Sequence, residues 1–194
     1  KIPNPERVAK QYPFQLSGGM RQRVMIAMAL ACEPDILIAD EPTTALDVTI
    51  QAQILELMQD LQKKLGMAII MVTHDLGVIA ELCDEIIVLY GGRVCERGTA
   101  EDIFYRPCHE YTKGLLRSIP NVDRIGEKLI PIPGTPINLL NMPKGCAFCP
   151  RCENAMKICI EQVPPEMQMP DGHYAACWLN VKEEMLAKQG GANK

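Results

Sequence analysis

Residues 35–42 read DILIADEP, a short apolar run that ends on two carboxylates and a proline. A continuous apolar run of this length is typical of a strand buried on both faces of a parallel sheet. Residues 67–73, MAIIMVT, repeat the pattern and also lead into polar residues. The stretch between the two runs is apolar at every third or fourth position, which predicts an amphipathic helix that Gly66 ends. The apolar stripe of this helix consists of Ile50, Ile54, Leu57, Leu61 and Leu65.

The order strand, helix, strand implies a right-handed crossover in an α/β sheet. Ligands of such sheets bind outside the carboxyl ends of the strands. We therefore expect Asp40, Glu41 and His74 to meet at one edge of the sheet. One carboxylate there can hold Mg²⁺, and its neighbour can position a water for attack on a phosphate. The plainer interpretation is two acids in an exposed turn and a histidine that is an ordinary polar residue.

YPFQLSGGMRQRVMIAMALA, residues 12–31, predicts a helix that Ser17 caps and Pro34 stops. Glycine costs a helix about 1 kcal/mol relative to alanine, so Gly18 and Gly19 at its start suggest a close approach to the backbone. Free N–H groups and the helix dipole at this end suit an anion such as a phosphate. The alternative is a simple Ser-Gly-Gly turn before a core helix.

Residues 85–98, EIIVLYGGRVCERG, predict a β-hairpin around Gly91 and Gly92. Thr99 and Asp102 then form a capping-box pattern at the next helix start. From residue 120 onward frequent prolines exclude a long helix or a central strand. We therefore expect a domain over residues 1–119, a small Cys/Pro-rich module over 120–180, and a flexible tail over 181–194.

The chain has 194 residues and a formal net charge of -4, which provides no broad basic surface for nucleic acid. Its longest apolar run, residues 25–32, is far shorter than the roughly 18 residues that cross a bilayer. A role at a membrane would therefore need another chain as anchor. The sequence starts at Lys1 with no initiator methionine and no secretory pattern, and we expect an N-terminal part to be missing.

Of the 9 cysteines, those from residue 146 to residue 177 lie close together, which predicts a metal site in a reducing compartment. Spacing alone favours Cys146, Cys149 and Cys152, a C-x₂-C-x₂-C run as in ferredoxins. Four thiolates would equally suit a structural zinc ion. His173 is expected beside the metal ligands rather than among them, and His109 at the surface. Small buried hydrophobes or inert thiols are predicted at Cys32, Cys83, Cys95 and Cys108.

LSGGM, ILIADEP, ALD and VTHD follow one another as in the ATPase domain of ABC transporters, which the chain resembles from its signature motif onward. The resemblance implies a partial P-loop α/β domain that uses ATP and Mg²⁺. It implies that Ser17, Gly18 and Gly19 bind the γ-phosphate of ATP held on a partner subunit, and that Asp40 is the Walker B ligand of Mg²⁺. Met20 replaces the more usual glutamine of the signature and leaves the phosphate contacts intact.

The same resemblance makes Glu41 the general base, Asp47 the D-loop residue that crosses the ATPase dimer, and His74 the switch histidine. The 194 residues contain no G-x-x-x-x-G-K-[ST] loop, the Walker A motif, and no glutamine loop before the signature. Because the Walker A lysine and amides hold the ATP phosphates, we expect the chain alone to be inactive as an ATPase.

IPIPGTP, PKGCAFCPRC and HYAAC resemble the C-terminal extension of peptide and nickel importer ATPases. This implies an ATPase subunit that drives uptake of oligo- or dipeptides at the cytoplasmic face of the cell membrane, with nickel as the alternative cargo. The implied partners are a second ABC ATPase subunit, a permease pair and an extracytoplasmic peptide-binding protein. The family pattern assigns a 4Fe-4S cluster, or alternatively Zn²⁺, to Cys146, Cys152, Cys159 and Cys177, and leaves Cys149 as an extra thiol.

Two rival functions belong to other classes. A DNA-repair ABC ATPase shares the signature and Walker B motifs, but such proteins usually carry a long insertion near the signature, whereas residues 19–40 run without one. A non-catalytic metal-binding module would make the cysteines the function and the ATPase motifs vestigial. The intact Asp40, Glu41 and His74 argue against that second rival.

Overall fold

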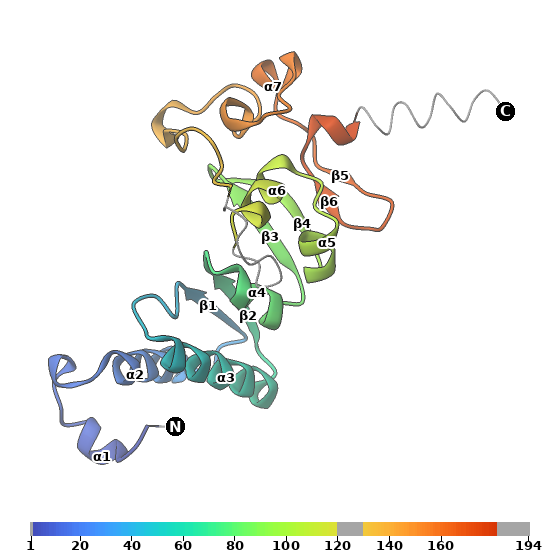
Figure 1. The fold of residues 1–194 in the computed structure, drawn as a ribbon. Helices are drawn as coiled ribbons and strands as arrows, with labels where there is room; N and C mark the ends of the chain where they lie inside the picture. The colour runs from blue at the N-terminus through green and yellow to red at the C-terminus, as the bar shows by residue number, and fades with distance from the viewer. Residues whose placement is uncertain (1, 120–129, 182–194) are drawn as a thin grey trace. The chain divides into compact units, whose positions relative to one another are not determined.

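The computed structural model describes residues 2–119 and 130–181, drawn as a ribbon in Figure 1. The chain divides into two compact units, Lys1–Val78 and Ile79–Lys194. The first unit contains α1 (Pro5–Val8), the 3-10 helix η1 (Pro13–Gln15), α2 (Gly18–Leu30), β1 (Ile36–Asp40), α3 (Val48–Leu65), β2 (Ala68–Val72) and the start of α4 (Leu76–Leu82). No described helix is long and apolar enough to span a membrane.

The strands β1 and β2 pair in parallel, with Ile36 opposite Ala68 and Asp40 opposite Val72. This confirms the parallel α/β arrangement that the two apolar runs predict. Local signals define the connecting helix, because Asp47 caps the N-terminus of α3 and Gly66 ends it at φ 67°. Only a residue without a Cβ adopts this left-handed conformation at little cost.

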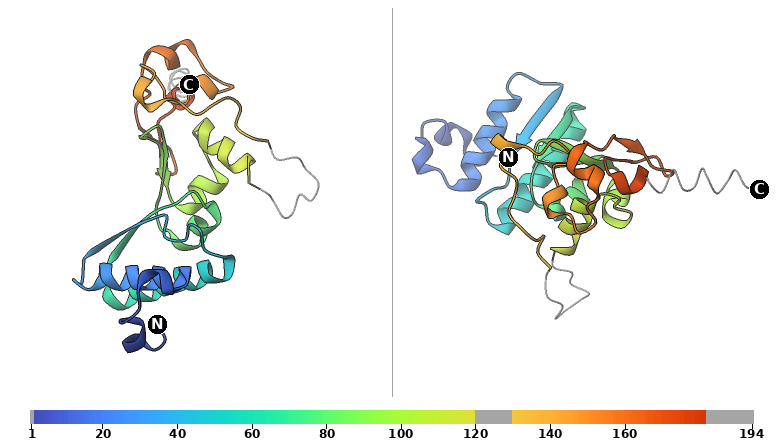
Figure 2. Two further views of the ribbon diagram at one scale, coloured as in Figure 1. Left: turned by 90° about the vertical axis from the view of Figure 1, so that its left-hand side faces the viewer. Right: turned by 90° about the horizontal axis from the view of Figure 1, so that it is seen from above.

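The core of the first unit lies between the sheet and the helices α2 and α3, which contact one another and lie side by side in Figure 2. Its buried members are Ile26, Leu37, Ile54, Met58 and Met67. The apolar stripe predicted for α3 therefore faces the core as expected, although Leu65 at its end is 52% exposed.

The prediction that β1 is buried on both faces is wrong for this chain. Leu37 faces the core, but Ile36 and Ile38 on the opposite side of β1 are 57% and 68% exposed. Ile70 and Val72 extend this exposed face onto β2. The physical reason is that α2 and α3 both pack on the same face of the sheet.

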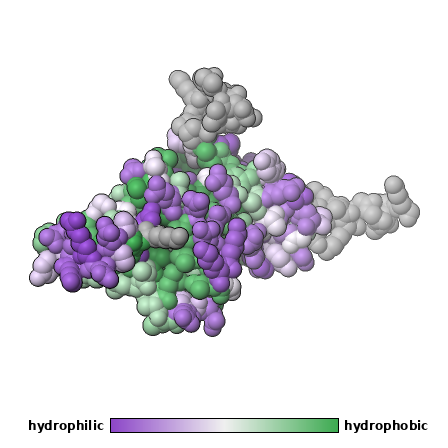
Figure 3. Space-filling view, turned by 90° about the horizontal axis from the view of Figure 1, so that it is seen from below, coloured by the Kyte–Doolittle hydropathy of each residue, from purple (hydrophilic) through white to green (hydrophobic). Residues whose placement is uncertain are grey.

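Apolar side chains also reach the surface on the helical side of this unit. Met25 and Met28 of α2 are 61% and 71% exposed. Figure 3, a view from below, shows hydrophobic residues in green at the surface between hydrophilic residues in purple. The methionine-rich helix α2 is therefore apolar on its outer side as well as towards the core.

The second unit is built on an antiparallel sheet with the strand order β3-β4-β6-β5. Gly91 and Gly92, both at positive φ, connect β3 to β4 at the predicted turn. Thr99 and Asp102 form the predicted capping box of α5. The elements are β3 (Ile86–Tyr90), β4 (Arg93–Gly98), α5 (Ala100–Tyr105), α6 (Glu110–Arg117), η2 (Leu139–Asn141), η3 (Cys149–Arg151), α7 (Lys157–Glu161), β5 (Met167–Gln168) and β6 (Tyr174–Ala175).

The cysteine-rich segment shares a core with the strands that precede it in the sequence. Tyr90 and Cys95 from β3 and β4 are buried with Ala147 and Phe148. The ring of Phe148 packs edge-on against Tyr90, with 5.3 Å between the ring centroids. The boundary predicted near residue 120 and almost all of the tail predicted for 181–194 lie outside the described residues.

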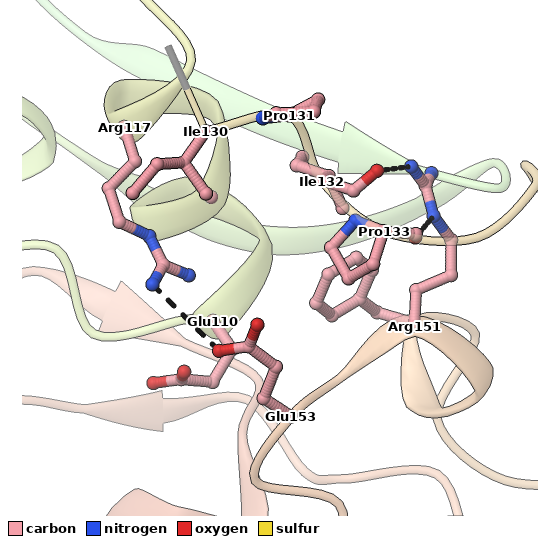
Figure 4. A pocket seen from close by; sticks show the side chains of 10 residues that line it. Glu110, Arg117, Ile130, Pro131, Ile132, Pro133, Arg151 and Glu153 are labelled. Carbon is pink, nitrogen blue, oxygen red and sulfur yellow. Dashed lines mark hydrogen bonds and ion pairs between the residues drawn. The ribbon is translucent and has the colours of Figure 1, made fainter. Parts of the chain in front are cut away.

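Arg151 holds the proline-rich segment at residues 131–133 against this core. Its guanidinium donates hydrogen bonds to Pro133 O (2.8 Å) and Ile132 O (3.0 Å), as Figure 4 shows, and to the Tyr90 hydroxyl (3.3 Å). Arg117 in the same small pocket makes a long ion pair with Glu153, at 3.9 Å. Arg151 thus fixes two carbonyl groups of this segment, which also packs on the core through Ile132.

Candidate functional site

Glu41 and His74 form a hydrogen-bonded pair where the two parallel strands end. Glu41 directly follows β1, and its N–H donates to Val72 O at the end of β2 (2.8 Å). His74 Nδ1 lies 2.8 Å from Glu41 Oε1, while the Thr44 hydroxyl donates to Glu41 Oε2 at 2.7 Å. The structure therefore joins two of the three side chains that the sequence places at this edge.

This pair has a definite electrostatic character. The hydrogen bond from Thr44, followed by that from His74, holds the pKa of Glu41 below its usual value. The hydrogen bond to Glu41 and its negative charge raise the pKa of His74. The imidazole is 82% exposed and remains accessible to a ligand. Glu41 is thus ionised, and a protonated His74 would present a positive edge to solvent beside it.

The loop that carries Glu41 has two unusual backbone conformations. Glu41 has φ 48° and Ala45 has φ 62°, both in the left-handed region that residues with a Cβ rarely adopt. Such conformations cost about 1–2 kcal/mol each and persist only where neighbouring contacts enforce them. Here the bond from Glu41 N to Val72 O and the bond from Thr44 N to Glu41 O (3.2 Å) fix the turn.

Asp40 is the last residue of β1, and it is exposed beside the pair formed by Glu41 and His74. A carboxylate in this position offers the oxygen ligands that Mg²⁺ prefers. An exposed group can bind the ion through water as well as directly. The end of β1 therefore carries one carboxylate open to solvent and one held by two hydrogen bonds.

Ser17 caps α2 as predicted, because its side chain accepts a hydrogen bond from Met20 N at 3.3 Å. Gly18 and Gly19 form the first turn of α2, where backbone N–H groups have no partner within a helix. Helix packing alone explains why residue 19 is a glycine, because a Cβ there would lie 2.7 Å from Ile50 Cγ2 on α3. The close approach that the paired glycines suggest is thus, for Gly19, explained by helix packing.

The contacts of the signature residues run to α3 and the loop before it. A Cβ on Gly18 would meet Leu46 at 3.4 Å, the residue before the D-loop candidate Asp47. Asp47 itself accepts from Ile50 N at 3.0 Å as the cap of α3. Gly18 and Gly19 thus approach the segment around Asp47, through the side chains of Leu46 and Ile50.

Three residues of this site were not singled out from the sequence. Thr44 holds the free oxygen of Glu41, and Gln51 Nε2 donates to Asp75 Oδ2 at 3.0 Å. Asp75 also accepts from Gly77 N (3.0 Å) at the start of α4. The aspartate that follows His74 in VTHD was the available signal, because a side chain after a strand and before a helix is a typical cap.

All five clustered cysteines line one small cavity in the second unit, together with His109, Glu110 and Phe148. The five are Cys146, Cys149, Cys152, Cys159 and Cys177. Burial raises the pKa of Cys146, Cys177 and Cys152, in the last case to about 11. These thiols are therefore neutral at pH 7 unless a cation replaces their protons.

The spacing of the sulfur atoms bears on what they hold. Sulfur atoms bound to one tetrahedral Zn²⁺ lie about 3.8 Å apart, since each Zn–S bond is about 2.3 Å. In the described part of the chain, no three of these five sulfur atoms all lie within 4.8 Å of one another. The thiols line one cavity, but no three of their sulfur atoms lie as close together as the ligands of one Zn²⁺ ion would.

Gly145 brings the two ends of the cysteine cluster together. A Cβ on this residue would lie 2.2 Å from Cys159 O and would also overlap the backbone of Ile160. The close approach lets Cys146 N donate to Cys159 O at 2.8 Å. Glycine at this position is therefore required for Cys146 to lie beside Cys159.

The prediction that His109 lies at the surface is wrong. It is 3% exposed, and its Nδ1 accepts from Tyr111 N at 3.0 Å as the cap of α6. Burial lowers the pKa of His109 to about 4, so the ring is neutral at pH 7. The reason is tertiary, because the Phe148 ring from the cysteine-rich segment covers it. His173 is also buried, but it does not line the cysteine cavity.

Two family models match the sequence. Residues 2–44 match the ABC transporter model, and residues 95–159 match the model of the oligopeptide/dipeptide transporter C-terminal region. A solved metal-chelate type ABC transporter in an inward-facing conformation is similar at a TM-score of 0.51 and 29% identity, over 58% of this chain and 43% of that chain. The likeness supports an ABC-type α/β fold.

Curated relatives match over nearly the whole chain. The dipeptide transport ATP-binding protein DppD of Bacillus subtilis is 57% identical over 100% of this chain and 58% of its own length. The oligopeptide transport ATP-binding protein OppD of Salmonella typhimurium is 54% identical over 94% of this chain and 54% of its own length. The chain thus spans about half the length of these relatives. It belongs to the family of ABC transporter ATP-binding subunits of the oligopeptide/dipeptide type.

Proposed function

We propose that this chain forms part of the ATP-hydrolysing subunit of an ABC importer that takes up oligo- or dipeptides. The observation that carries the proposal is the identity of 57% with a dipeptide transport ATP-binding protein across the entire chain. The pair of Glu41 and His74 at the ends of β1 and β2 supports it, because this is where an α/β sheet binds its ligand.

Within this proposal, Asp40 holds Mg²⁺ and Glu41 orients the water that attacks the γ-phosphate of ATP. Bound Mg²⁺ would neutralise the charge that develops on the phosphate oxygens. Glu41 keeps its charge through Thr44 and His74, and each of its oxygens retains a second lone pair for a water. His74 places its exposed edge against the γ-phosphate and holds Glu41 in position.

We further propose that the signature residues Ser17, Gly18 and Gly19 bind ATP held on a second ATPase subunit. The N–H groups of the first turn of α2 supply the anion site, aided by the helix dipole. Asp47, at the N-terminus of α3, would reach the same dimer interface.

The cysteine cluster is proposed to hold a 4Fe-4S cluster, with Zn²⁺ as the alternative. Cys146, Cys152, Cys159 and Cys177 are the proposed ligands, and Cys149 is the fifth thiol in the cavity. The five thiols that line this one cavity support a thiolate-bound metal group there. An anaerobic measurement of iron, acid-labile sulfide and zinc distinguishes the two: iron with sulfide supports the cluster, and stoichiometric zinc contradicts it.

The other proposed parts are a second ABC ATPase, a transmembrane permease pair and an extracytoplasmic peptide-binding protein, with this chain at the cytoplasmic face. We also propose that an ATPase domain spans residues 1–119 and that residues 120–180 form a separate Cys/Pro-rich module. Because the 194 residues contain no Walker A loop, the chain alone should hydrolyse no ATP. Steady hydrolysis by these residues alone would contradict this point.

Uptake by the complete transporter in proteoliposomes tests the cargo. We expect ATP-dependent accumulation of a labelled dipeptide or oligopeptide, and ATP hydrolysis that rises when the peptide-loaded binding protein is added. Ni²⁺ is the matched competitor, since nickel is the alternative cargo. Accumulation of Ni²⁺ without peptide would overturn the peptide assignment while leaving the ATPase assignment in place.

A further inference from the structure

A second group of potential metal ligands lies apart from the cysteine cavity. Glu96 of β4, Cys108 before α6 and His173 before β6 have ligand atoms that all lie within 4.8 Å of one another. Glu96 and the His173 side chain are 0% and 1% exposed. A charge buried this deeply is normally paired or bound to a metal.

The ring of His173 is oriented as in many metal sites. Its Nδ1 lies 2.7 Å from Asp171 Oδ1, in the turn between β5 and β6. A carboxylate that accepts the Nδ1–H leaves a lone pair on Nε2, the usual arrangement of a metal-binding histidine. Nε2 is buried and makes no hydrogen bond within the described residues. It faces Glu96 Oε1 at 3.4 Å.

That separation fits one shared cation. Zn–N and Zn–O bonds of about 2.0–2.2 Å place a nitrogen and an oxygen ligand about 3.4 Å apart across a tetrahedral ion. Glu96 can still bind a cation. Its two oxygens each accept one backbone N–H, from Cys108 (2.5 Å) and His109 (3.1 Å), and each keeps a second lone pair. Cys108 Sγ completes three ligands and is partly exposed, which leaves a path for the ion and for a water as the fourth ligand.

The neighbouring group of acidic residues is a weaker candidate for a metal site. Asp102, Asp171 and His173 also lie within 4.8 Å of one another. Arg106 already supplies the positive charge there, since it contacts Asp102 Oδ1 at 2.5 Å and Asp171 Oδ2 at 3.6 Å. Glu96, in contrast, has the imidazole of His173 as its ion-pair partner.

We propose that Glu96, Cys108 and His173 bind one Zn²⁺ ion. A mixed set of one sulfur, one nitrogen and one oxygen ligand suits this borderline-soft cation. The ion would join β4, the start of α6 and the turn before β6, three segments distant in the sequence. Gly98 allows His173 to lie this close to β4, because a Cβ at residue 98 would be 2.7 Å from His173 Cβ. This proposal does not depend on the ATPase function or on the cysteine cluster.

Cadmium-113 NMR of the chemically reduced, metal-stripped chain tests the site with Cd²⁺ as the probe. We expect two resonances, one from the sulfur-rich cysteine cavity and one at the lower shift of a mixed sulfur, nitrogen and oxygen site. His173→Gln and Cys108→Ala should each remove the mixed resonance and keep the other. Cys83→Ala, a substitution of a partly buried thiol outside both groups, should keep both resonances.

The wild-type chain decides the question even where a variant fails to fold. The ¹⁵N shifts of the His173 imidazole should move when Cd²⁺ is added, since Nε2 becomes a ligand. Absence of a mixed-ligand resonance, with His173 shifts that Cd²⁺ leaves unchanged, would overturn the proposal. That result would instead leave His173 as a structural contact between Glu96 and Asp171.

Discussion

Glu41 Oε1 and His74 Nδ1 lie 2.8 Å apart although 33 positions separate the two residues in the sequence. The parallel register of β1 and β2 creates this proximity, because it sets Asp40 opposite Val72 and thus brings the following turns together. The contact favours the charged form of both partners, since it lowers the pKa of Glu41 and raises that of His74. The pair is the part of the site for which the structure gives the most specific predictions.

The His74 imidazole should titrate above its usual value of 6.5. Because its pKa is raised in the folded chain, its stabilising contribution is complete below pH 6.5 and is lost as the pH rises through the folded pKa. The lowered pKa of Glu41 makes its contribution complete above pH 4.5 and lost as the pH falls through the folded pKa. The pair is therefore strongest between these two values, which an NMR titration of His74 checks.

Glu41→Gln serves as the control for that titration, because it keeps the shape and removes the charge. It should return the pKa of His74 towards 6.5. His109, whose pKa burial lowers to about 4, should stay neutral from pH 5 upward in both proteins. A His74 that titrates at or below 6.5 in the unaltered chain would contradict the pair.

Gly19→Ala should lower the stability of the first unit by about 1–3 kcal/mol, the typical cost of overpacking. The added Cβ would lie 2.7 Å from Ile50 Cγ2, which forces α2 and α3 apart. Gly18→Ala is the matched control, since its Cβ would meet Leu46 at an ordinary 3.4 Å. Urea unfolding of both variants should show a loss only for Gly19→Ala. Equal stabilities would remove the packing explanation of this glycine.

Sequence patterns predict the parts of this site that depend on local structure. The cap at Ser17, the end of α3 at Gly66 and the position of Asp40 at a strand end all follow from spacing and residue type. The burial of His109 does not, because it depends on Phe148 from a distant segment. Gly19 is an intermediate case: the sequence shows that something approaches it closely, and only the structure identifies Ile50.

The exposed face of the sheet shows the same limit. Apolar runs predict strands correctly at residues 36–40 and 68–72, but they cannot show which face a neighbouring element covers. Here α2 and α3 cover one face and leave Ile36 and Ile38 exposed. The pairing of the cysteine-rich segment with β4, through Glu96 and Ala175, likewise depends on contacts between distant segments.

Arg151→Ala should loosen the segment at residues 131–133. The substitution removes three hydrogen bonds from a charged donor, and we expect a loss of about 2 kcal/mol in the stability of the second unit. Arg117→Ala, in the same pocket, removes a 3.9 Å ion pair between half-exposed side chains and should change little. Thermal unfolding and limited proteolysis of both variants check this, and equal effects would contradict the role of Arg151.

Metal binding by the cysteine cavity should release protons and weaken as the pH falls. Burial raises the pKa of Cys146, Cys152 and Cys177, so each thiol must lose a proton when it becomes a ligand. Calorimetry in buffers of different ionisation enthalpy measures the protons released. Cys32→Ala, which removes an exposed thiol, should leave the result unchanged. Binding that is independent of pH from 6 to 8 would argue against these thiols as ligands.

If Glu41 orients the water that attacks ATP, a complete ATPase that carries Glu41→Gln should hydrolyse ATP far more slowly. We expect turnover to fall by about 10²–10⁴-fold, the usual contribution of a general base. ATP binding and ATP-driven dimerisation should persist, since Asp40 and the signature residues are unchanged. Turnover within a few-fold of that of the unaltered protein would remove Glu41 from its proposed role in the reaction.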